Sequence, residues 1–374
     1  MKVLSIVLND FINDSRVIKT SRSLSLQGHE VLVVALHSDS LPEYESNDAF
    51  NVHRVNLKSR TWSKNRIVQL FKYAEFIVRV LWKYKNSFDV IHCNDLNTLP
   101  MGILLKAISN SSVSVVYDSH EYQTEIKGLS NKLKPLLRFI EKFLLRFVDK
   151  TITVSESISS EYKRIYGIEK PELVLNCPNY VVPYDQDLIR EQLDITKEKK
   201  ILLYQGGFST GRGIDILLSA FESYEKGDIA LVFMGYGPLE ARIIEFAERV
   251  DDIYVLPAVS PDVLLQYTCS ADFGVIFYED NCLNHRFCSP NKIFEYLMAG
   301  IPVLSSKLFE LERIINANGL GVVAKSNDVQ GFLDALTDLS KYDNALFVQR
   351  LEENRQKFCW EAQERVLLKV YNDL

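Results

Sequence analysis

The sequence predicts an α/β protein made of two doubly wound domains that face one another across a cleft. Short apolar runs alternate with amphipathic segments along most of the chain, as expected for parallel strands joined by crossover helices. The 374 residues are too many for one ordinary core. The pattern also restarts after a stretch rich in Pro and Asn at 171–187. We therefore expect domains at 1–180 and 181–358, and a last helix at 359–374 that crosses back to the first domain.

The first half contains five apolar runs that predict strands. They are residues 2–8, 31–36, 88–93, 113–117 and 150–154. Amphipathic segments near 15–27, 65–86, 96–109 and 131–147 predict the helices between them. The first run meets Asn9 and Asp10 and carries one Lys, so it indicates a strand and not a signal peptide.

The second half repeats this pattern with six predicted strands. They are residues 201–204, 229–234, 253–256, 273–278, 302–305 and 321–324. Helices fit near 213–225, 238–249, 290–299 and 328–339. The third of these opens with "SPNK", where Ser289 is the expected cap and Pro290 the first helical residue.

The composition is that of a soluble globular protein, with 47% hydrophobic and 25% charged residues. No run of about 18 uncharged apolar residues is present, so no membrane-spanning segment is expected. The six cysteines form no C-x-x-C pair. We interpret them as reduced thiols of a cytoplasmic protein.

Charge is distributed unevenly between the halves. Residues 1–180 carry a net charge of +5, and the remainder carries −11. Segment 54–85 has nine Lys and Arg against one Glu, and segment 127–150 has seven against two acidic residues. Both segments interleave aromatic residues and Leu, which favours helices lying on an anionic membrane surface, such as the inner face of the plasma membrane. The alternative is solvated helix faces with aromatic residues in the core. The acidic remainder makes nucleic acid a poor partner.

Glycine-rich turns follow two strands of the second half. Gly206 and Gly207 follow the first strand, with Arg212 just before the next helix, and Gly235 and Gly237 follow the second strand. Glycine lets a backbone approach a ligand closely, and a guanidinium can hold a phosphate through two parallel hydrogen bonds. Each turn alone could equally be an ordinary flexible loop.

The "SPNK" helix adds an anion-binding end. Asn291, Lys292 and the free amides of the first turn favour an anion, where helices ordinarily place acidic residues. Glu295 lies on the same face one turn further along and suits a pair of ribose hydroxyls. The alternative is a solvated Lys292–Glu295 pair. Taken with the two glycine turns, the pattern indicates a nucleotide diphosphate site in which Ser289 also takes part.

The first half offers different side chains after its strands. His92 and Asp95 lie in "HCNDLNTL", and His120 and Glu121 lie in "YDSHEY". A lone histidine is more often structural, but two such loops on one sheet favour His120 and Asp95 as cleft residues. No metal site is expected. The single D-x-D, at Asp185 and Asp187, fits a helix cap better than Mg²⁺.

The motifs resemble those of a known family over nearly the whole chain. The similar stretches are "DSRVIKTSRSLSLQGHEV" (14–31), "YDSHE" (117–121), "VLNCPN" (174–179), "GRGIDILLSAF" (211–221), "GYGPLE" (235–240), "SPNKIFEYLMAGIPVL" (289–304) and "WEAQERVLLKVY" (360–371). The chain is similar to the GT-B retaining glycosyltransferases of family four, especially enzymes of bacterial polysaccharide assembly. The resemblance implies two Rossmann-like domains, no metal, and no cofactor beyond a nucleotide-diphosphate sugar as substrate.

The resemblance also implies roles for individual residues. Arg212 matches the basic residue that binds the donor diphosphate, Glu295 the second glutamate of E-x7-E that holds the ribose, and His120 the cleft histidine near the donor sugar. With Lys292, these are the expected catalytic residues.

Three positions depart from the family pattern. The first glutamate of E-x7-E is Phe287, so its sugar contact would have to come from Asn284, His285 or Arg286. Gly207 stands where the family has a second phosphate-binding Arg. The family's glycine pair near residue 12 is missing, which makes Asn13 and Arg16 acceptor-side candidates beside Asp95 and Glu121.

The site residues and the resemblance together predict transfer of a hexosyl group from a UDP- or GDP-sugar to a glycan or lipid-linked acceptor, and the resemblance implies retention of configuration. Two alternatives stay open. One is a nucleotide-sugar 2-epimerase with the same architecture, and the other is a non-catalytic partner subunit of a glycosyltransferase complex.

Overall fold

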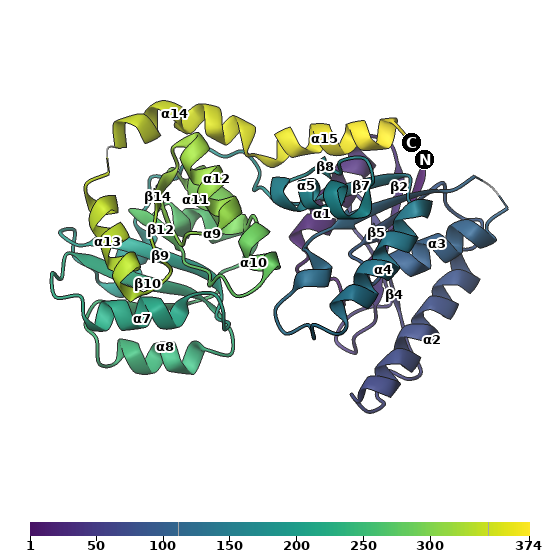
Figure 1. Cartoon of the computed structure of the whole chain (residues 1–374), viewed down its shortest axis with the longest axis horizontal. Coiled ribbons are helices and arrows are strands. Elements are labelled where there is room, and N and C mark those ends of the chain that lie inside the picture. The colour runs from purple at the N-terminus through teal and green to yellow at the C-terminus, as the bar shows by residue number, and fades with distance from the viewer. Residues whose placement is uncertain (111, 343) are drawn as a thin grey trace. The chain divides into compact units, whose positions relative to one another are not determined.

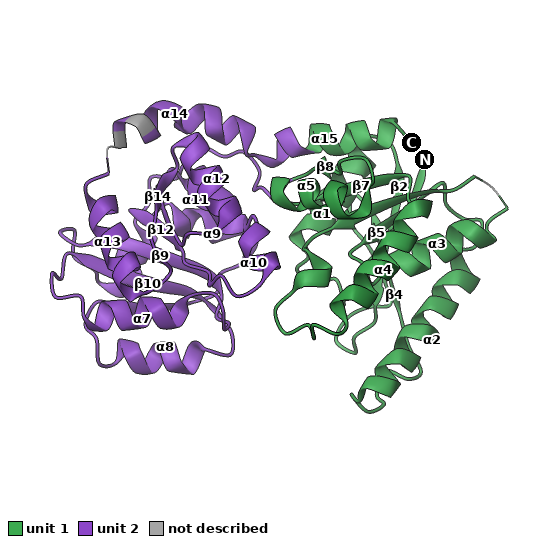
Figure 2. Cartoon of the chain, in the orientation of Figure 1, with its two compact units in different colours: residues 1–174, 364–374 green, residues 175–363 purple. Residues whose placement is uncertain are grey.

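Two mainly parallel sheets organise the chain, one in each of two compact units (Figures 1 and 2). The structure is a computed structural model that describes residues 1–110, 112–342 and 344–374. Unit 1 comprises residues 1–174 and 364–374, and unit 2 comprises residues 175–363. The chain therefore changes unit slightly before residue 180 and returns to unit 1 within its last helix.

The sheet of unit 1 has the strand order β3-β4-β2-β1-β5-β6-β7-β8, and only the β3–β4 pair is antiparallel. Its strands are β1 (Lys2–Ile6), β2 (Glu30–Leu36), β3 (Tyr44–Ser46), β4 (Asn51–Val55), β5 (Val90–Asn94), β6 (Ser114–Ser119), β7 (Lys150–Thr153) and β8 (Glu172–Leu173). Its helices are α1 (Ser15–Leu26), α2 (Arg66–Tyr84), α3 (Leu99–Ile108), α4 (Lys134–Leu144), α5 (Glu156–Tyr166) and most of α15 (Trp360–Asn372), with 3₁₀ turns at Gln123–Glu125 and Leu145–Phe147.

The sheet of unit 2 is fully parallel, in the order β11-β10-β9-β12-β13-β14. Its strands are β9 (Lys200–Gly207), β10 (Ile229–Tyr236), β11 (Ile253–Pro257), β12 (Phe273–Ile276), β13 (Val303–Ser305) and β14 (Gly321–Val323). Its helices are α6 (Leu188–Leu193), α7 (Ile214–Glu222), α8 (Glu240–Ala247), α9 (Pro261–Thr268), α10 (Leu283–Phe287), α11 (Asn291–Ala299), α12 (Phe309–Asn318), α13 (Val329–Ser340) and α14 (Asn344–Lys357). Helices α7 and α8 lie on one face of this sheet and α11 and α12 on the other (Figure 1).

Local sequence signals explain where many helices begin and end. The side chain of Asp14 accepts a hydrogen bond from the backbone N–H of Val17 at the start of α1, and Asn65 caps α2 through Val68 in the same way. Helix α11 ends at Gly300, whose φ of 81° is a left-handed conformation that glycine adopts without strain.

Every strand that the apolar runs predict is present, and three further strands lie at the end regions of the unit 1 sheet. These are β3, β4 and β8, which are short or carry polar residues such as Asn51 and Arg54. Strands in such places need no continuous apolar run, so periodicity does not reveal them.

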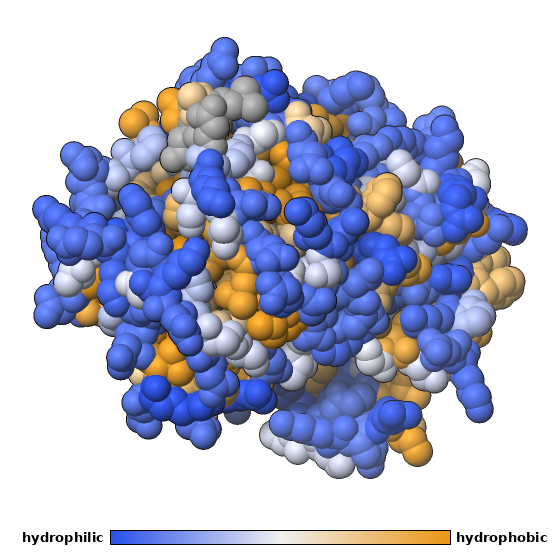
Figure 3. All heavy atoms as spheres, turned by 60° about the vertical axis from the view of Figure 1, so that its left-hand side comes forward, coloured by the Kyte–Doolittle hydropathy of each residue, from blue (hydrophilic) through white to orange (hydrophobic). Residues whose placement is uncertain are grey.

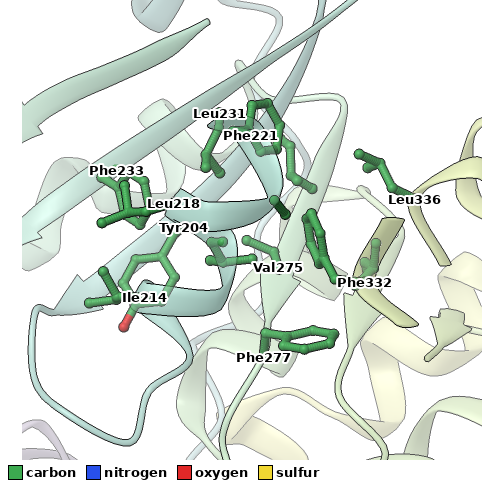
Figure 4. Packing of buried hydrophobic residues seen from close by; sticks show 14 of the residues in the cluster. Tyr204, Ile214, Leu218, Phe221, Leu231, Phe233, Val275, Phe277, Phe332 and Leu336 are labelled. Atoms are coloured by element: carbon green, nitrogen blue, oxygen red, sulfur yellow. The ribbon is translucent and has the colours of Figure 1, made fainter. Parts of the chain in front are cut away.

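The core of unit 2 is rich in aromatic side chains. Tyr204 on β9 packs against Phe233 on β10 with ring centroids 5.3 Å apart, and Phe277 packs edge-on against Phe332 of α13 at 5.3 Å (Figure 4). This packing fixes the carboxyl ends of β9 and β12, from which the predicted site loops emerge.

The last helix completes the core of unit 1. Leu367, Val370 and Tyr371 of α15 are buried, and the Tyr371 hydroxyl lies 2.7 Å from Nδ1 of His92 on β5. The rings of His92 and Tyr371 are stacked with centroids 6.1 Å apart. The segment after residue 363 is thus an integral part of this unit.

No helix within the described ranges has the length and apolar character needed to span a bilayer. The face drawn in Figure 3 is mainly hydrophilic, with hydrophobic side chains in separate spots.

Candidate functional site

Unit 2 gathers its predicted site residues at the carboxyl edge of its sheet. Strands β10, β9 and β12 are parallel neighbours, so the loops that follow them lie side by side. Gly206 pairs with Gly235 at the ends of β9 and β10. This edge is where open α/β sheets bind their ligands.

The glycines of this edge serve two different purposes. A Cβ on Gly235 would lie 2.0 Å from the carbonyl oxygen of Gly206, and one on Gly237 would lie 2.5 Å from that of Phe208. Gly235 and Gly237 are therefore needed because neighbouring backbone atoms leave no room for a side chain. The sequence instead predicts that they let a ligand come close to the backbone. Gly206 and Gly207 are exposed, and a Cβ on Gly207 would meet nothing within 4 Å. Space for a ligand therefore lies above the end of β9.

Lys292 lies at this edge of the sheet, next to the Gly206 turn. Its side chain is only 7% exposed, and its Nζ lies 4.1 Å from the ring centroid of Tyr204 and 5.4 Å from that of Tyr278. A Cβ on Gly206 would lie 3.7 Å from this Nζ, so the ammonium sits directly beneath that open turn. Burial, and then the charge of Arg212, lower the pKa of Lys292 to about 7.

Arg212 is held on the same tyrosine. Its guanidinium carbon lies 4.6 Å from the ring centroid of Tyr278, and Nη1 donates a hydrogen bond to the Tyr278 hydroxyl. Arg212 and Lys292 therefore share one aromatic neighbour, and their role in binding a diphosphate stays a prediction. Two basic side chains near one ring favour binding of an anion.

The start of α11 differs from its prediction in one respect. Pro290 occupies the cap position and Asn291 is the first helical residue, so Ser289 is not the cap. The Ser289 side chain is buried, and its hydroxyl has no hydrogen-bond partner among the described residues. Asn291 is exposed, but Lys292 is buried. Lys292 and Glu295 therefore do not form the solvent-exposed pair of the alternative interpretation.

Glu295 is half-buried and oriented by a neighbouring strand. Its Oε2 accepts a hydrogen bond from the side-chain amide of Gln205, whose Oε1 accepts one from Thr268 at 2.9 Å. The hydroxyl of Tyr296 accepts from the backbone N–H of Gln205 at 3.2 Å. These bonds fix the position of the carboxylate at the sheet edge.

Phe287 replaces the first glutamate of the family motif with an aromatic contact. Its ring centroid lies 6.0 Å from that of Phe309 on α12. Of the three candidate substitutes, Arg286 forms an ion pair with Asp280 at 2.8 Å, His285 contacts the carbonyl of Glu279 at 3.1 Å, and Asn284 is buried. The polar contact of the missing glutamate therefore has no direct equivalent at position 287.

Unit 1 builds a second polar cluster, at the end of β6. Asp118 is 1% exposed and accepts two hydrogen bonds from Arg16, from Nε at 2.9 Å and from Nη2 at 2.7 Å. The third bond of Arg16 goes to the carbonyl of Val174 at 2.8 Å. Arg16 is only 3% exposed and positions Asp118, and its predicted place on the acceptor side stays a prediction.

Two histidines complete this cluster. Nε2 of His92 lies 3.4 Å and Nε2 of His120 lies 3.5 Å from the same oxygen of Asp118. Burial alone would raise the pKa of Asp118, but Arg16 and His120 hold it well below its usual range.

His120 lies between two carboxylates. Its Nδ1 is 3.7 Å from Asp95, its Nε2 faces Asp118, and its backbone N–H donates to Asp95 at 3.0 Å. Burial works against the charged imidazole, but the two carboxylates outweigh it and raise the pKa of His120. Asp95 has φ of 67°, a left-handed conformation that costs a non-glycine residue about 1 kcal/mol. The structure therefore brings His120 and Asp95 together, whereas the sequence predicts them only as separate cleft residues.

The remaining acceptor-side candidates, Asn13 and Glu121, are exposed. Several residues that shape the two clusters were not singled out from the sequence: Tyr204, Gln205, Tyr278, Asp118 and Tyr371. Asp118 lies in the quoted "YDSHE" stretch, and an aspartate at the end of an apolar strand could have drawn attention to it. Within the described ranges no group of three or more His, Cys, Asp or Glu has a metal-binding arrangement.

The two basic segments carry exposed apolar side chains, although Phe76 and Tyr84 of α2 are buried, as the alternative of a core-facing aromatic side expects. Helix α2 exposes Ile67, Leu70, Phe71, Val78 and Trp82, and the segment around α4 exposes Leu133, Leu136, Phe139, Phe143 and Phe147. Some cations are neutralised, because Glu125 binds both Lys134 and Arg138. Arg54 is buried and paired with Glu45 at 2.8 Å, so it does not belong to the basic surface.

Comparison with known proteins identifies the chain. Residues 15–177 match the family described as Glycosyltransferase Family 4, and residues 199–341 match Glycosyl transferases group 1. The chain is 25% identical to the uncharacterized glycosyltransferase MJ1607 of Methanocaldococcus jannaschii, over 94% of this chain and 91% of that protein. It is 22% identical to chitobiosyldiphosphodolichol beta-mannosyltransferase of Candida albicans, over 92% of this chain and 82% of that enzyme.

Solved structures show the same fold. Sucrose-phosphate synthase from Thermosynechococcus elongatus superimposes with a TM-score of 0.80 at 18% identity, covering 100% of this chain and 98% of that one. HepE from Anabaena, crystallised with UDP, gives 0.75 at 14% identity and covers both chains fully (100% each). The protein is a glycosyltransferase enzyme with the GT-B fold, and it belongs to the group 1, family 4 type.

Proposed function

We propose that the protein transfers a hexosyl group from a UDP- or GDP-sugar to a glycan or lipid-linked acceptor, without a metal ion, in surface polysaccharide biosynthesis. The observation that carries the proposal is Lys292, a buried basic side chain beneath the open Gly206 turn and next to Arg212. Relatives support the class of substrate, since HepE structures contain UDP and UDP-glucose and other relatives are named for lipid-linked or lipopolysaccharide acceptors.

The roles of the residues follow from their chemistry. Cleavage of the donor's glycosidic bond adds negative charge to the departing diphosphate. Arg212 and Lys292 stabilise that charge where it develops, which is what a divalent cation would otherwise do. Glu295 accepts hydrogen bonds from the ribose hydroxyls.

The geometry of Arg212 gives a direct test of this role. Arg212→Ala should lower turnover at least about 100-fold, the typical loss for one charge-stabilising donor. Arg249→Ala is the matched control, because Arg249 is an exposed arginine of the same unit that pairs with Glu222. Activity in EDTA should equal that in buffer. A loss below about fivefold in Arg212→Ala would remove the residue from the leaving-group site.

The donor is identified by thermal-shift screening against UDP, GDP, ADP and their sugars. A ligand at 100 times its dissociation constant adds about 2.7 kcal/mol of stability. Incubation with the donor alone must leave the sugar unchanged, since an epimerase would alter it without any acceptor. Failure of every nucleotide to shift the transition would favour the non-catalytic subunit.

Stereochemistry is the finer part of the proposal. We propose retention, by attack on the face of the sugar that the diphosphate leaves, with the diphosphate accepting the acceptor's proton. NMR of the product formed from an α-linked donor decides the matter. A β-linked product would mean inversion, for which the His120–Asp95 pair is the candidate general base.

The exposed apolar residues of α2 and α4, together with basic residues around them such as Lys142 and Arg146, support attachment to an anionic membrane. Insertion of the Phe139 and Phe143 side chains would bury apolar surface while Lys142 and Arg146 meet lipid phosphates. We place the protein in the cytoplasm, peripheral on the inner face of the plasma membrane.

Flotation with vesicles tests this attachment. The wild type should float with vesicles that contain phosphatidylglycerol and dissociate in salt, whereas Phe139→Glu with Phe143→Glu should remain at the bottom. Val348→Glu is the control, because Val348 is an equally exposed apolar residue on α14 of unit 2. Flotation that is equal for all three proteins, or absent for the wild type, would refute this site of attachment.

A further inference from the structure

Lys292 differs from an ordinary phosphate-binding lysine because its Nζ has no hydrogen-bond partner among the described residues. Its Nζ is buried, and no hydrogen-bond acceptor lies within reach among the described residues. An ammonium group has three donors, and burying one without partners costs several kcal/mol or drives the group to its neutral form.

The groups that face Lys292 come from four elements of unit 2. Tyr204 lies beneath it on β9, Arg212 precedes α7, Tyr278 and Cys288 lie in the segment after β12, and Glu295 is one turn further along α11. The tyrosine faces attract a cation weakly. Arg212 opposes the positive charge, and Glu295 favours it, but the Glu295 carboxylate is held by Gln205.

This balance changes when an anion arrives. A diphosphate above Gly206 supplies the missing acceptor oxygens and also offsets the charge of Arg212. Both changes favour the ammonium form of Lys292. A nearby negative charge and new hydrogen-bond acceptors each raise the pKa of an amine. Burial lowers the pKa of Lys292 to about 7 in the free protein, so the two forms are close in free energy before the ligand binds.

We propose that the protein binds a nucleotide-diphosphate sugar together with one proton, which Lys292 takes up from solvent. This inference rests on the proposed function and adds a coupling between donor binding and pH. No covalent bond changes in the step: the proton joins the Nζ lone pair, and the resulting ammonium pairs with phosphate oxygens. When the glycosidic bond later breaks, the diphosphate gains a further negative charge, which the ammonium is already present to stabilise.

Calorimetry measures the coupling directly. Binding of UDP-glucose and of GDP-mannose is titrated in buffers of different ionisation enthalpy, because the observed heat then varies with the number of protons taken up. Neither sugar nucleotide has a phosphate that titrates near neutrality. Uptake should be about one proton at about pH 8 and close to zero at about pH 6, where Lys292 is already charged. The affinity should fall about tenfold per pH unit between about pH 7 and pH 9.

Two variants assign the proton to Lys292. Lys292→Arg keeps a permanent charge, so it should bind without proton uptake and with little pH dependence. Lys292→Met should bind at least about tenfold more weakly and also without uptake. Uptake that persists in Lys292→Met would assign the proton to another group, such as His285 beside Tyr278, and would overturn the inference.

The outcomes separate this inference from the proposed function. Binding of either sugar nucleotide by the wild type without proton uptake at about pH 8 would overturn the inference alone. Failure of both to bind at millimolar concentration would overturn the inference and the proposed donor site together.

Discussion

Replacement of Lys292 by methionine should stabilise unit 2 even though it disables the donor site. The lysine side chain is 7% exposed and its Nζ has no described hydrogen-bond partner. Methionine has a similar length, fills irregular apolar space and makes favourable contacts with aromatic rings such as Tyr204. The substitution therefore removes the cost of a buried polar group and creates no large cavity.

The magnitude follows from the protonation of Lys292. Its pKa is about 7 in the folded protein, whereas an unfolded lysine has a pKa of about 10.4. At 1.36 kcal/mol per pH unit, this difference costs the folded state about 4 kcal/mol at about pH 7. Loss of the contact with Tyr204 and imperfect packing offset part of the gain, so we expect a net stabilisation of about 2 kcal/mol.

The pH dependence has a definite sign. Because the unfolded lysine binds a proton more tightly, the wild type should become more stable as pH rises from about 7 towards 10. Lys292→Met should lack this rise, since methionine does not titrate.

Urea unfolding followed by Trp360 fluorescence measures both effects. The chain has three tryptophans, and Trp360 is the one in unit 2. Replacement of the exposed Trp62 and Trp82 by Phe leaves Trp360 as the reporter. Lys307→Met is the matched control, because Lys307 is exposed in the same unit and its loss should change stability by less than about 0.5 kcal/mol. Destabilisation of Lys292→Met by more than 1 kcal/mol would refute the account of Lys292 as an uncompensated group.

Three further predictions concern packing and charge. Arg16→Met should lower the free energy of unfolding of unit 1 by about 3–5 kcal/mol, because it leaves the buried carboxylate of Asp118 without its main partner. Since the pKa of His120 is raised, its contribution to stability is present below about pH 6.5 and is lost as pH rises through the folded pKa, which unfolding at a series of pH values will record. Gly235→Ala should cost about 1–3 kcal/mol, as its Cβ would strike the carbonyl oxygen of Gly206.

Each of these predictions has a control variant. Arg22→Met, on the exposed face of α1, should be neutral. His120→Gln should abolish the stability change attributed to the imidazole. Gly207→Ala should leave stability unchanged, because its Cβ would meet nothing within 4 Å. Equal effects in a variant and its control would contradict the assigned cause.

The sequence revealed most of the fold because buried parallel strands are continuous apolar runs. The core strands β1, β5, β9 and β10 belong to this class, with burial along nearly their whole length. Strand β4 was not predicted because its own residues do not form an apolar run. It is a strand because it pairs with its neighbours in the sheet.

Long-range burial limited the prediction of the site. Lys292 was expected to be near the surface. Nothing in the local sequence shows that the ring of Tyr204, far away in the chain, packs against the Lys292 side chain. Arg16 and Asp118 are 102 residues apart, so their ion pair could not be inferred from spacing. Similarly, Gly206 and Gly235 look alike in sequence, and only the strand register separates an open glycine from one required by packing.

The order of synthesis has a consequence for the last helix. Tyr371 packs on His92, yet unit 2 lies between them in the sequence, so Tyr371 leaves the ribosome only after unit 2. Until then the N-terminal unit exposes the apolar surface that Leu367, Val370 and Tyr371 later bury. Removal of the segment from Leu367 to Tyr371 would therefore leave the apolar core of unit 1 incomplete even though its eight strands were intact.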